Sequence, residues 1–515
     1  MARADPRPIP EVLAAVDLGS NSFHLVVARY IHGQLTVIDR LREVVRLGAG
    51  VSESGRLDRD VAARALACLE RFGQRLRDMH ARGVRIVGTN ALRRAHRKQA
   101  FLERAREALG HPIEIVSGME EARLIYAGVA HTSPAEAGRR MVFDIGGGST
   151  EVIIGEALEP IELASLQMGC VNMSERFFPG GRLSPKRLAR ARLAVELELA
   201  PVVARFRQLG WQHVAGSAGT VRAVGECLRE MDPAATSITA EGVEALLAAM
   251  GEVDDIRDLE FAAIDADRAG VFAGGAAVLA GLFDTFALGE LRVADGGLRE
   301  GLLYDMIGRM TDVDARERTV SAMQRRYQVD SAQAARVEAT VVDFLGQVDE
   351  AWQLADPHAE SMLRWSARLH EIGLDVSHNG YQRHGAYLLE NADMYGFARE
   401  DQLLLACLVG AHRRKPQLDA LERLVPPWDR KALWLIVLLR LAVLLHRARS
   451  GSSLPAIVLE AKGRTLTVRF PARWLDDNPL TEADLQREMA YLRALDIRLR
   501  VFSARTQLAA AAPAA

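Results

Sequence analysis

Long unbroken hydrophobic runs are missing from this chain of 515 residues. The longest, Ala432 to Leu445, is interrupted by Arg440 and is too short to span a bilayer, so it predicts a buried helix. The first eight residues are charged and rich in proline, and they contain no apolar stretch that could act as a signal peptide. We therefore expect a disordered lead-in and a cytoplasmic protein.

The chain also has few cysteines and a net charge close to zero. The four cysteines are widely separated and form no CxxC pair, which argues against a disulfide framework or a zinc site and fits a reducing compartment. The formal net charge of -2 provides no global positive field, so a polyanion site must be a local basic patch. We expect no nucleic-acid partner. The length is too great for a single core and predicts three or four domains.

What the chain does contain is one motif that occurs twice, VDLGSNS at residues 16–22 and FDIGGGS at residues 143–149. Each copy lies between two short apolar runs, which predicts a β-hairpin with a Gly/Ser tip. Backbone N–H groups at such a tip suit phosphate oxygens, and Asp17 and Asp144 direct carboxylates to a place where a metal or water could lie. A single copy is typical of a plain turn, whereas two copies favour a phosphate site. Its expected members are Gly19, Ser20, Asn21, Ser22, Gly146, Gly147, Gly148 and Ser149.

Three further glycine-containing loops fall at predicted strand-to-helix junctions, at residues 87–93, 215–220 and 295–300. Helix N-termini offer unpaired N–H donors to anions, and open α/β sheets place ligands at the ends of their strands. The basic run 93–98 predicts a solvated helix face, although its first arginine lies near enough to reach substrate. The candidate phosphate ligands in these loops are Thr89, Asn90, Arg93, Ser217, Gly219 and Thr220.

The segment that begins at Ser117 supplies a candidate for catalysis. Ser117 and Glu120 fit a capping box, in which Glu120 reaches back to the Ser117 N–H. This arrangement would leave Glu121 free to accept a proton from an attacking water. An alternative is that Glu121 only complements the helix dipole, and the spacing alone does not separate the two.

These motifs together resemble the exopolyphosphatase and guanosine pentaphosphate phosphatase family, of the actin, Hsp70 and sugar kinase fold superfamily. The resemblance rests on the two hairpin motifs and on SGMEEARL at residues 117–124, with weaker support from the remaining loops. It implies that Glu121 is the catalytic base and that Asp144 and Glu151 help to hold Mg²⁺ or the attacking water. With Asp17, these carboxylates form the expected metal site.

The resemblance and the alternation of strands and helices predict an α/β fold with four domains. We expect two actin-like (ribonuclease H-like) lobes at residues 1–125 and 126–306, a helical HD-like domain at 307–447, and a small α/β domain at 448–515. The lobes carry one phosphate loop each, and the last domain ends in a disordered alanine-rich tail.

The helical region contains a motif similar to that of HD phosphohydrolases, RLHEIG at residues 368–373. A metal-binding HD site needs a His-Asp dyad, and Glu371 in the second position puts a second metal centre in doubt. The histidines of this region could be ordinary core or surface residues. Alternatively, a basic track for a long polyanion would comprise His378, Arg383, His384, Arg413, Arg414 and Lys415.

The leading hypothesis is a Mg²⁺-dependent exopolyphosphatase that releases orthophosphate from the end of inorganic polyphosphate, one phosphate at a time. The close alternative is hydrolysis of the 5′-terminal phosphate of guanosine pentaphosphate, because both reactions use the same loops. An actin-fold kinase and a non-catalytic polyphosphate sensor are more distant alternatives, since a shared fold does not establish a function. The resemblance further implies a homodimer and leaves peripheral association with the inner membrane open.

Overall fold

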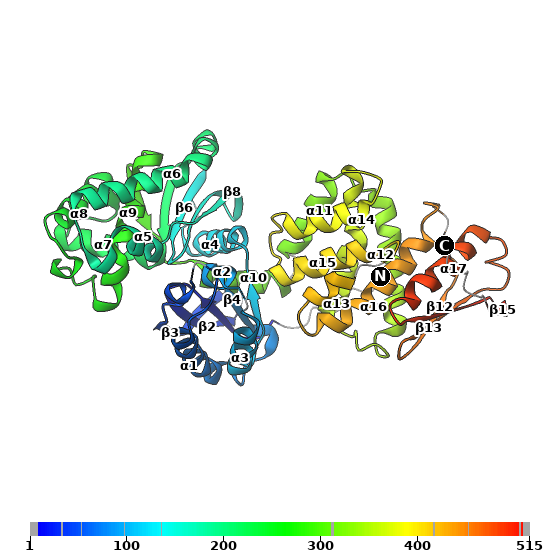
Figure 1. Ribbon diagram of the computed structural model, residues 1–515. Coiled ribbons are helices and arrows are strands. Elements are labelled where there is room, and N and C mark those ends of the chain that lie inside the picture. Colours follow the sequence, from blue (N-terminus) through cyan, green and yellow to red (C-terminus); the bar gives the residue numbers. More distant parts are fainter. Residues whose placement is uncertain are drawn as a thin grey trace. The chain divides into compact units, whose positions relative to one another are not determined.

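The computed structural model describes residues 9–31, 34–52, 54–96, 98–134, 136–310, 314–415, 418–451, 453–503 and 506–507 (Figure 1). The chain divides into two compact units, Met1–Ala315 and Arg316–Ala515. The N-terminal lead-in and the alanine-rich tail, both expected to be disordered, lie outside the described residues.

The first sheet of unit 1 has the strand order β3-β2-β1-β4-β5. β1 forms an antiparallel hairpin with β2 and pairs in parallel with β4, which in turn pairs in parallel with β5. The hairpin predicted around the first glycine motif is therefore confirmed. The strand bounds are β1 Val12–Leu18, β2 Ser22–Ile31, β3 Gln34–Val44, β4 Val84–Gly88 and β5 Ile113–Ile115.

The second sheet repeats this topology in the order β8-β7-β6-β9-β11, with β10 added at its edge. β6 forms an antiparallel hairpin with β7 and pairs in parallel with β9, as β1 does with β2 and β4. The repeated sequence motif thus reflects a repeated fold. The bounds are β6 Arg139–Ile145, β7 Thr150–Glu156, β8 Glu159–Leu166, β9 His213–Ser217, β10 Ile238–Thr239 and β11 Glu290–Val293.

Helices α1 (Arg59–Leu76) and α3 (Gln99–Leu109) pack on the first sheet and share its core. α1 begins where the Asp58 side chain accepts hydrogen bonds from the N–H groups of Asp60 (2.9 Å) and Val61 (3.0 Å). Its apolar residues recur at three- and four-residue intervals, so that one face is buried against the strands.

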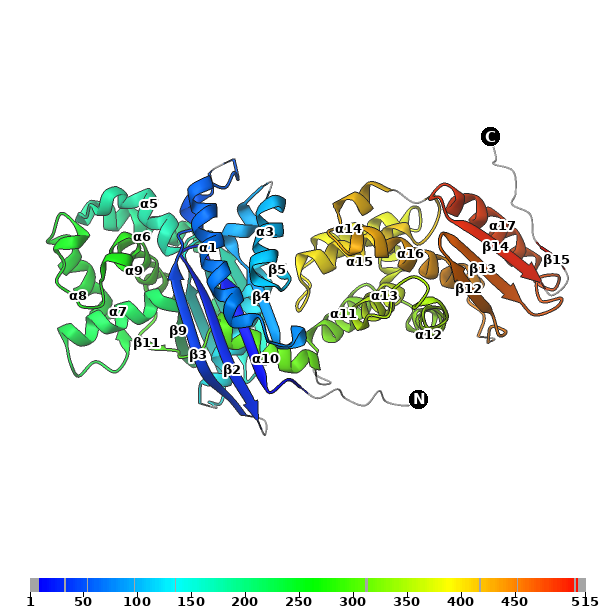
Figure 2. The same cartoon turned by 90° about the horizontal axis from the view of Figure 1, so that it is seen from below.

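A larger group of helices packs on the second sheet (Figure 2). Among them, α9 is long and apolar enough to cross a membrane, but 72% of its most apolar window is buried inside the protein. Its composition is therefore explained by its place in the lobe core. The bounds are α5 Cys170–Phe177, α6 Pro185–Leu209, α7 Ala218–Met231, α8 Ala240–Gly251 and α9 Ala266–Phe286.

Two helices cross the lobe boundaries expected from the sequence. α4 (Gly118–Thr132) begins in the expected first lobe but packs on β7 and β8 of the second sheet, whereas α10 (Leu298–Met310) packs on β1 of the first. The expected boundaries at 125/126 and 306/307 therefore fall inside these helices. α4 and α10 also pack closely on each other, so the pair joins the two lobes.

Unit 2 consists of helices followed by a four-stranded sheet of order β12-β13-β14-β15. The predicted buried helix at Ala432–Leu445 is confirmed as part of α16, where Arg440 is buried and paired with Glu488 of α17 at 2.5 Å. Helices and sheet share one continuous core, so the expected boundary at 447/448 does not separate two cores. The helices are α11 Ala315–Arg326, α12 Ser331–Val348, α13 Pro357–Leu369, α14 Tyr381–Asn391, α15 Arg399–Ala411, α16 Trp428–Leu445 and α17 Pro479–Arg493. The strands are β12 Val458–Lys462, β13 Thr465–Phe470, β14 Arg498–Ser503 and β15 Thr506–Gln507.

Candidate active site

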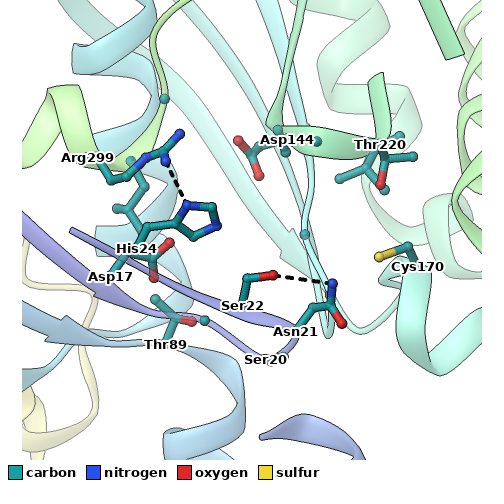
Figure 3. Close-up of a pocket in the computed structure, with 18 of the residues that line it drawn as sticks. Asp17, Ser20, Asn21, Ser22, His24, Thr89, Asp144, Cys170, Thr220 and Arg299 are labelled. Atoms are coloured by element: carbon teal, nitrogen blue, oxygen red, sulfur yellow. Dashed lines mark hydrogen bonds between the residues drawn. The ribbon is translucent and has the colours of Figure 1, made fainter. Parts of the chain in front are cut away.

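A cavity of about 400 Å³ lies in unit 1 where the loops after β1, β4, β6 and β9 meet (Figure 3). Parallel pairing of β1 with β4 and of β6 with β9 brings the carboxyl ends of these strands together. The predicted loop residues that line it are Gly19, Ser20, Asn21, Ser22, Thr89, Asn90, Gly146, Gly147, Gly148, Ser149, Gly219 and Thr220.

The two hairpin tips approach each other so closely that any side chain at their glycines would be crowded. A Cβ atom on Gly148 would lie 3.0 Å from Ser20 Oγ, and one on Gly147 would lie 3.1 Å from Asn21 N. Glycine therefore allows the two loops to face one cavity with their backbone groups accessible.

Glu121 lies in the first turn of α4, as predicted, and it lines the cavity. The helix begins where Ser117 Oγ accepts a hydrogen bond from the Glu120 N–H at 3.1 Å, which confirms one half of the expected capping box. The Glu120 carboxylate instead accepts hydrogen bonds from Arg123 Nε (2.7 Å) and Nη2 (2.8 Å). A buried guanidinium is a stronger partner for a carboxylate than a backbone N–H.

Glu121 is not free, contrary to the expectation from the sequence. Arg93 Nη1 donates a hydrogen bond to Glu121 Oε2 at 2.7 Å and also contacts the Val116 carbonyl at 2.9 Å. Arg93, which the sequence placed among the candidate phosphate ligands, does not line the cavity and lies behind Glu121 instead. The ion pair orients the candidate catalytic carboxylate.

Three further buried carboxyl groups surround this position. Burial, assisted by the charge of Glu121, raises the pKa of Asp17 to about 7 and that of Asp144 to about 6. The same causes raise the pKa of Glu151 well above its usual value. Ser217 Oγ donates a hydrogen bond to Asp144, so Ser217 acts behind the lining rather than in it. Ionising all of these carboxyl groups is unfavourable, because they are buried and repel one another, unless a positive charge lies between them.

These carboxyl groups fit a divalent cation. Asp17 Oδ1 and Glu151 Oε2 are buried oxygens without a hydrogen-bond partner in the described part of the chain, and carboxylate oxygen is the donor that Mg²⁺ prefers. Among the described residues no three His, Cys, Asp or Glu side chains form a ready-made metal cage. Mg²⁺ is usually bound by one or two carboxylates together with waters and substrate phosphates, so such a cage is not required.

The sequence did not single out His24 and Arg299 as site residues, although both line the cavity. Arg299 Nη1 donates to His24 Nδ1 at 2.8 Å (Figure 3), and burial together with Arg299 and Arg42 lowers the pKa of His24 to about 3. The imidazole is therefore neutral. His24 pairs with Asp17 in the first hairpin as Glu151 pairs with Asp144 in the second, so the repeat could have identified it. Four more arginines were missed: Arg40, Arg42, Arg222 and Arg268.

A second cavity, of about 250 Å³, lies in unit 2 and takes only His378 and Arg413 from the expected polyanion track. Arg413 and Arg414 also line a small cavity nearby. The remaining members of the expected track line neither cavity: Arg383, His384 and Lys415.

The two-lobed α/β fold and the glycine loops facing buried carboxylates define a phosphate-handling enzyme with an actin-like fold. The sequence matches the model of the Ppx/GppA phosphatase family over residues 26–310 and that of Ppx/GppA phosphatase domain III over residues 315–489. The chain belongs to the Ppx/GppA phosphatase family and is a hydrolase of that family.

Curated relatives match nearly the whole chain. It is 38% identical to guanosine-5′-triphosphate,3′-diphosphate pyrophosphatase of Vibrio vulnificus over 492 residues, which cover 95% of this chain and 97% of the relative. The protein of the same name from Aeromonas hydrophila is 38% identical over 92% of this chain and 96% of its own length.

Solved structures match somewhat more than half of the chain. The Ppx/GppA family member of Aquifex aeolicus has a TM-score of 0.50 and 27% identity, covering 58% of this chain and 98% of its own. An exopolyphosphatase of Cytophaga hutchinsonii has a TM-score of 0.54 and 23% identity, covering 59% of this chain and 99% of its own, and supports the fold alone.

Proposed function

We propose that this protein hydrolyses the terminal 5′ phosphoanhydride of guanosine 5′-triphosphate 3′-diphosphate, releasing orthophosphate. The observation that carries the proposal is the 38% identity, over 95% of the chain, to a relative named for this substrate. The leading expectation from the sequence was exopolyphosphatase activity, and the names of the full-length relatives favour the alternative instead.

The residues of the cavity suit this reaction. The N–H groups of the two glycine hairpins and the helix N-terminus after Thr89 would hold the oxygens of the terminal phosphate. Phosphoryl transfer depends mainly on positioning and on neutralising the charge of those oxygens, to which Arg299 would contribute.

Glu121 would orient the attacking water and accept its proton. The water oxygen forms a bond to the terminal phosphorus, and the bond between that phosphorus and the bridging oxygen breaks. The bridging oxygen stays with the 5′-diphosphate of the nucleotide, which is the leaving group. The ion pair with Arg93 holds the Glu121 carboxylate in one orientation, as a base requires.

Mg²⁺ would be held by Asp17 and Asp144, with Glu151 behind them. When bound, it would supply positive charge to the phosphate oxygens. The buried, unpartnered oxygens of Asp17 and Glu151 support this assignment.

The test is phosphate release by the purified protein with Mg²⁺, comparing guanosine pentaphosphate with long-chain polyphosphate. We expect faster turnover of the nucleotide and a loss of about 10²- to 10⁴-fold in Glu121→Gln, the usual size of a general-base contribution. Glu70→Gln, at an exposed position of α1, is the matched control. Preference for polyphosphate would restore the exopolyphosphatase hypothesis, and wild-type turnover by Glu121→Gln would remove Glu121 from the mechanism.

A further inference from the structure

The cavity of about 250 Å³ in unit 2 has no assigned role. It lies where the end of α13, the start of α14, the loop after α15 and the chain after α16 converge. Its lining is Gln333, His370, Glu371, Leu374, His378, Tyr381, Arg413, Val443, Arg447 and Arg449. It shares no residue with the catalytic cavity and belongs to the other compact unit.

His370 lines this cavity and has an unused acceptor. The side chain is 1% exposed, and its Nδ1 lies 2.7 Å from the Ala367 carbonyl, so Nδ1 carries the hydrogen. Nε2 therefore bears a lone pair, and it has no hydrogen-bond partner within the described ranges. A buried polar atom without a partner in a native protein points to a missing ligand or water.

A metal ion does not explain this atom. The neighbouring carboxylate, Glu371, accepts a hydrogen bond from Arg449 Nη2 at 2.5 Å, so a guanidinium already neutralises the charge that a cation would use. The cavity is thus better suited to an anion than to a cation.

Three guanidinium groups line the cavity against this single, already paired carboxylate. Arg447 forms an ion pair with Asp484, and Arg449 forms ion pairs with Asp330 and Glu371. Each guanidinium has five N–H donors, so these pairs leave donors for other acceptors. Arg413 lies over the Tyr381 ring at 4.5 Å and forms no salt bridge in the part of the chain that the structure describes. The positive charge of Arg413 is therefore not paired with a carboxylate in the described part of the chain.

The geometry points to a binding site for a small phosphorylated anion, whose phosphate group lies between Arg413, Arg447 and His370. Guanidinium groups match phosphate oxygens with paired donors, and the O–H of a monohydrogen phosphate can donate to the free Nε2 of His370. The volume accommodates a free phosphate or one nucleotide but not a long chain. The site differs from the expected polyanion track, because only two of the six expected residues, His378 and Arg413, line it.

The test is calorimetric titration of the full-length, metal-free protein with inorganic phosphate and, in a second arm, with guanosine 5′-diphosphate. We expect two sites in the wild type, one in each unit, and at least a tenfold loss of affinity at one of them in Arg413→Gln. Lys415→Gln, an exposed cation two residues away that does not line the cavity, should retain both sites. Tighter binding of the nucleotide at the affected site identifies a nucleotide as the ligand, and equal binding identifies free phosphate.

Because Arg413 packs on Tyr381, its variant could fail to fold, which circular dichroism would show. Arg447→Gln is the second variant, because Arg447 is the other arginine proposed to bind the phosphate and its side chain is 51% exposed. A folded Arg413→Gln or Arg447→Gln protein in which one site is weakened supports the proposal. Wild-type affinity at every site in the folded variants, or no anion binding by the wild type, overturns it.

Discussion

Arg93 Nη1 lies 2.7 Å from Glu121 Oε2, and this ion pair joins the short helix α2 (Asn90–Arg94) to the first turn of α4. Arg93 does not line the cavity, so it acts on the reaction through Glu121. We expect Arg93→Gln to lower kcat by about 10- to 100-fold with a smaller change in KM, because a misplaced base loses near-attack geometry. Steady-state kinetics would show this division.

Arg94→Gln is the control for this prediction, since Arg94 is the adjacent exposed arginine of the same helix. Arg93→Lys should recover part of kcat because it keeps the charge, although it loses the shared contacts of the guanidinium. An Arg93→Gln enzyme with wild-type kcat would show that Glu121 needs no such support.

The raised pKa values of the site predict how pH and Mg²⁺ affect stability. Asp17 has a pKa of about 7 in the folded metal-free protein and an ordinary value of 3.8. The folded state therefore binds the proton more tightly, and its stability falls as pH rises from about 4 to 7, by about 1.4 kcal/mol per pKa unit. Mg²⁺ should reverse this loss by binding the ionised carboxylate.

Thermal unfolding measures this effect with and without Mg²⁺ at pH 5 and pH 8. We expect the rise in Tm on adding Mg²⁺ to be larger at pH 8, where Asp17 and Asp144 are ionised. Asp17→Asn should be more stable than the wild type at pH 8 without metal and should respond less to Mg²⁺. An equal response to Mg²⁺ in Asp17→Asn and the wild type would exclude Asp17 from the metal site.

The sequence predicted the parts of the fold that local patterns determine. A hairpin needs two apolar runs and a glycine-rich tip, and both copies of the motif supplied these within about 20 residues. The helix start at Ser117 was predicted for the same reason, because a cap involves neighbours in the chain.

The sequence did not reveal the parts that depend on distant contacts. Glu121 and Arg93 are 28 residues apart, and no local pattern shows that their side chains meet. The packing of α4 on the second sheet and of α10 on the first is likewise a tertiary choice, since each helix could have buried its apolar face against its own lobe. His24 lies beyond the glycine-rich tip, and only the pairing of the two strands places it opposite Asp17.

The close crossing of α4 and α10 predicts a strongly size-sensitive position. A Cβ atom on Gly301 of α10 would lie 1.8 Å from the Leu124 carbonyl oxygen, which is backbone and cannot move aside easily. We therefore expect Gly301→Ala to destabilise the protein by more than about 2 kcal/mol. Gly270→Ala in α9 is the control, because nothing lies within 4 Å of its added Cβ, and it should stabilise by about 0.5–1 kcal/mol. Urea unfolding of both variants tests the difference, and similar midpoints would contradict the close packing.

The same two helices are joined by a buried ionic network centred on Asp305. Its carboxylate accepts hydrogen bonds from Arg85 Nη1 (2.5 Å), Arg123 Nη2 (2.5 Å) and Arg309 Nε (2.8 Å). Burial opposes ionisation, but these guanidiniums outweigh it and hold the pKa of Asp305 below its usual range. The carboxylate is therefore ionised, and its contribution to stability is fully present at neutral pH.

Asp305→Asn would leave these buried guanidiniums without their shared counter-charge, and we expect a loss of about 3–5 kcal/mol in the free energy of unfolding at pH 7. Asp39→Asn is the control, because the Asp39 side chain is 40% exposed and lies 4.0 Å from Arg75. An exposed ion pair at that separation contributes little to stability. Arg123 also holds Glu120, the neighbour of Glu121, so the folded fraction of Asp305→Asn should show reduced kcat as well. A variant as stable as the wild type would mean that the network's attraction only balances the cost of burying its charges.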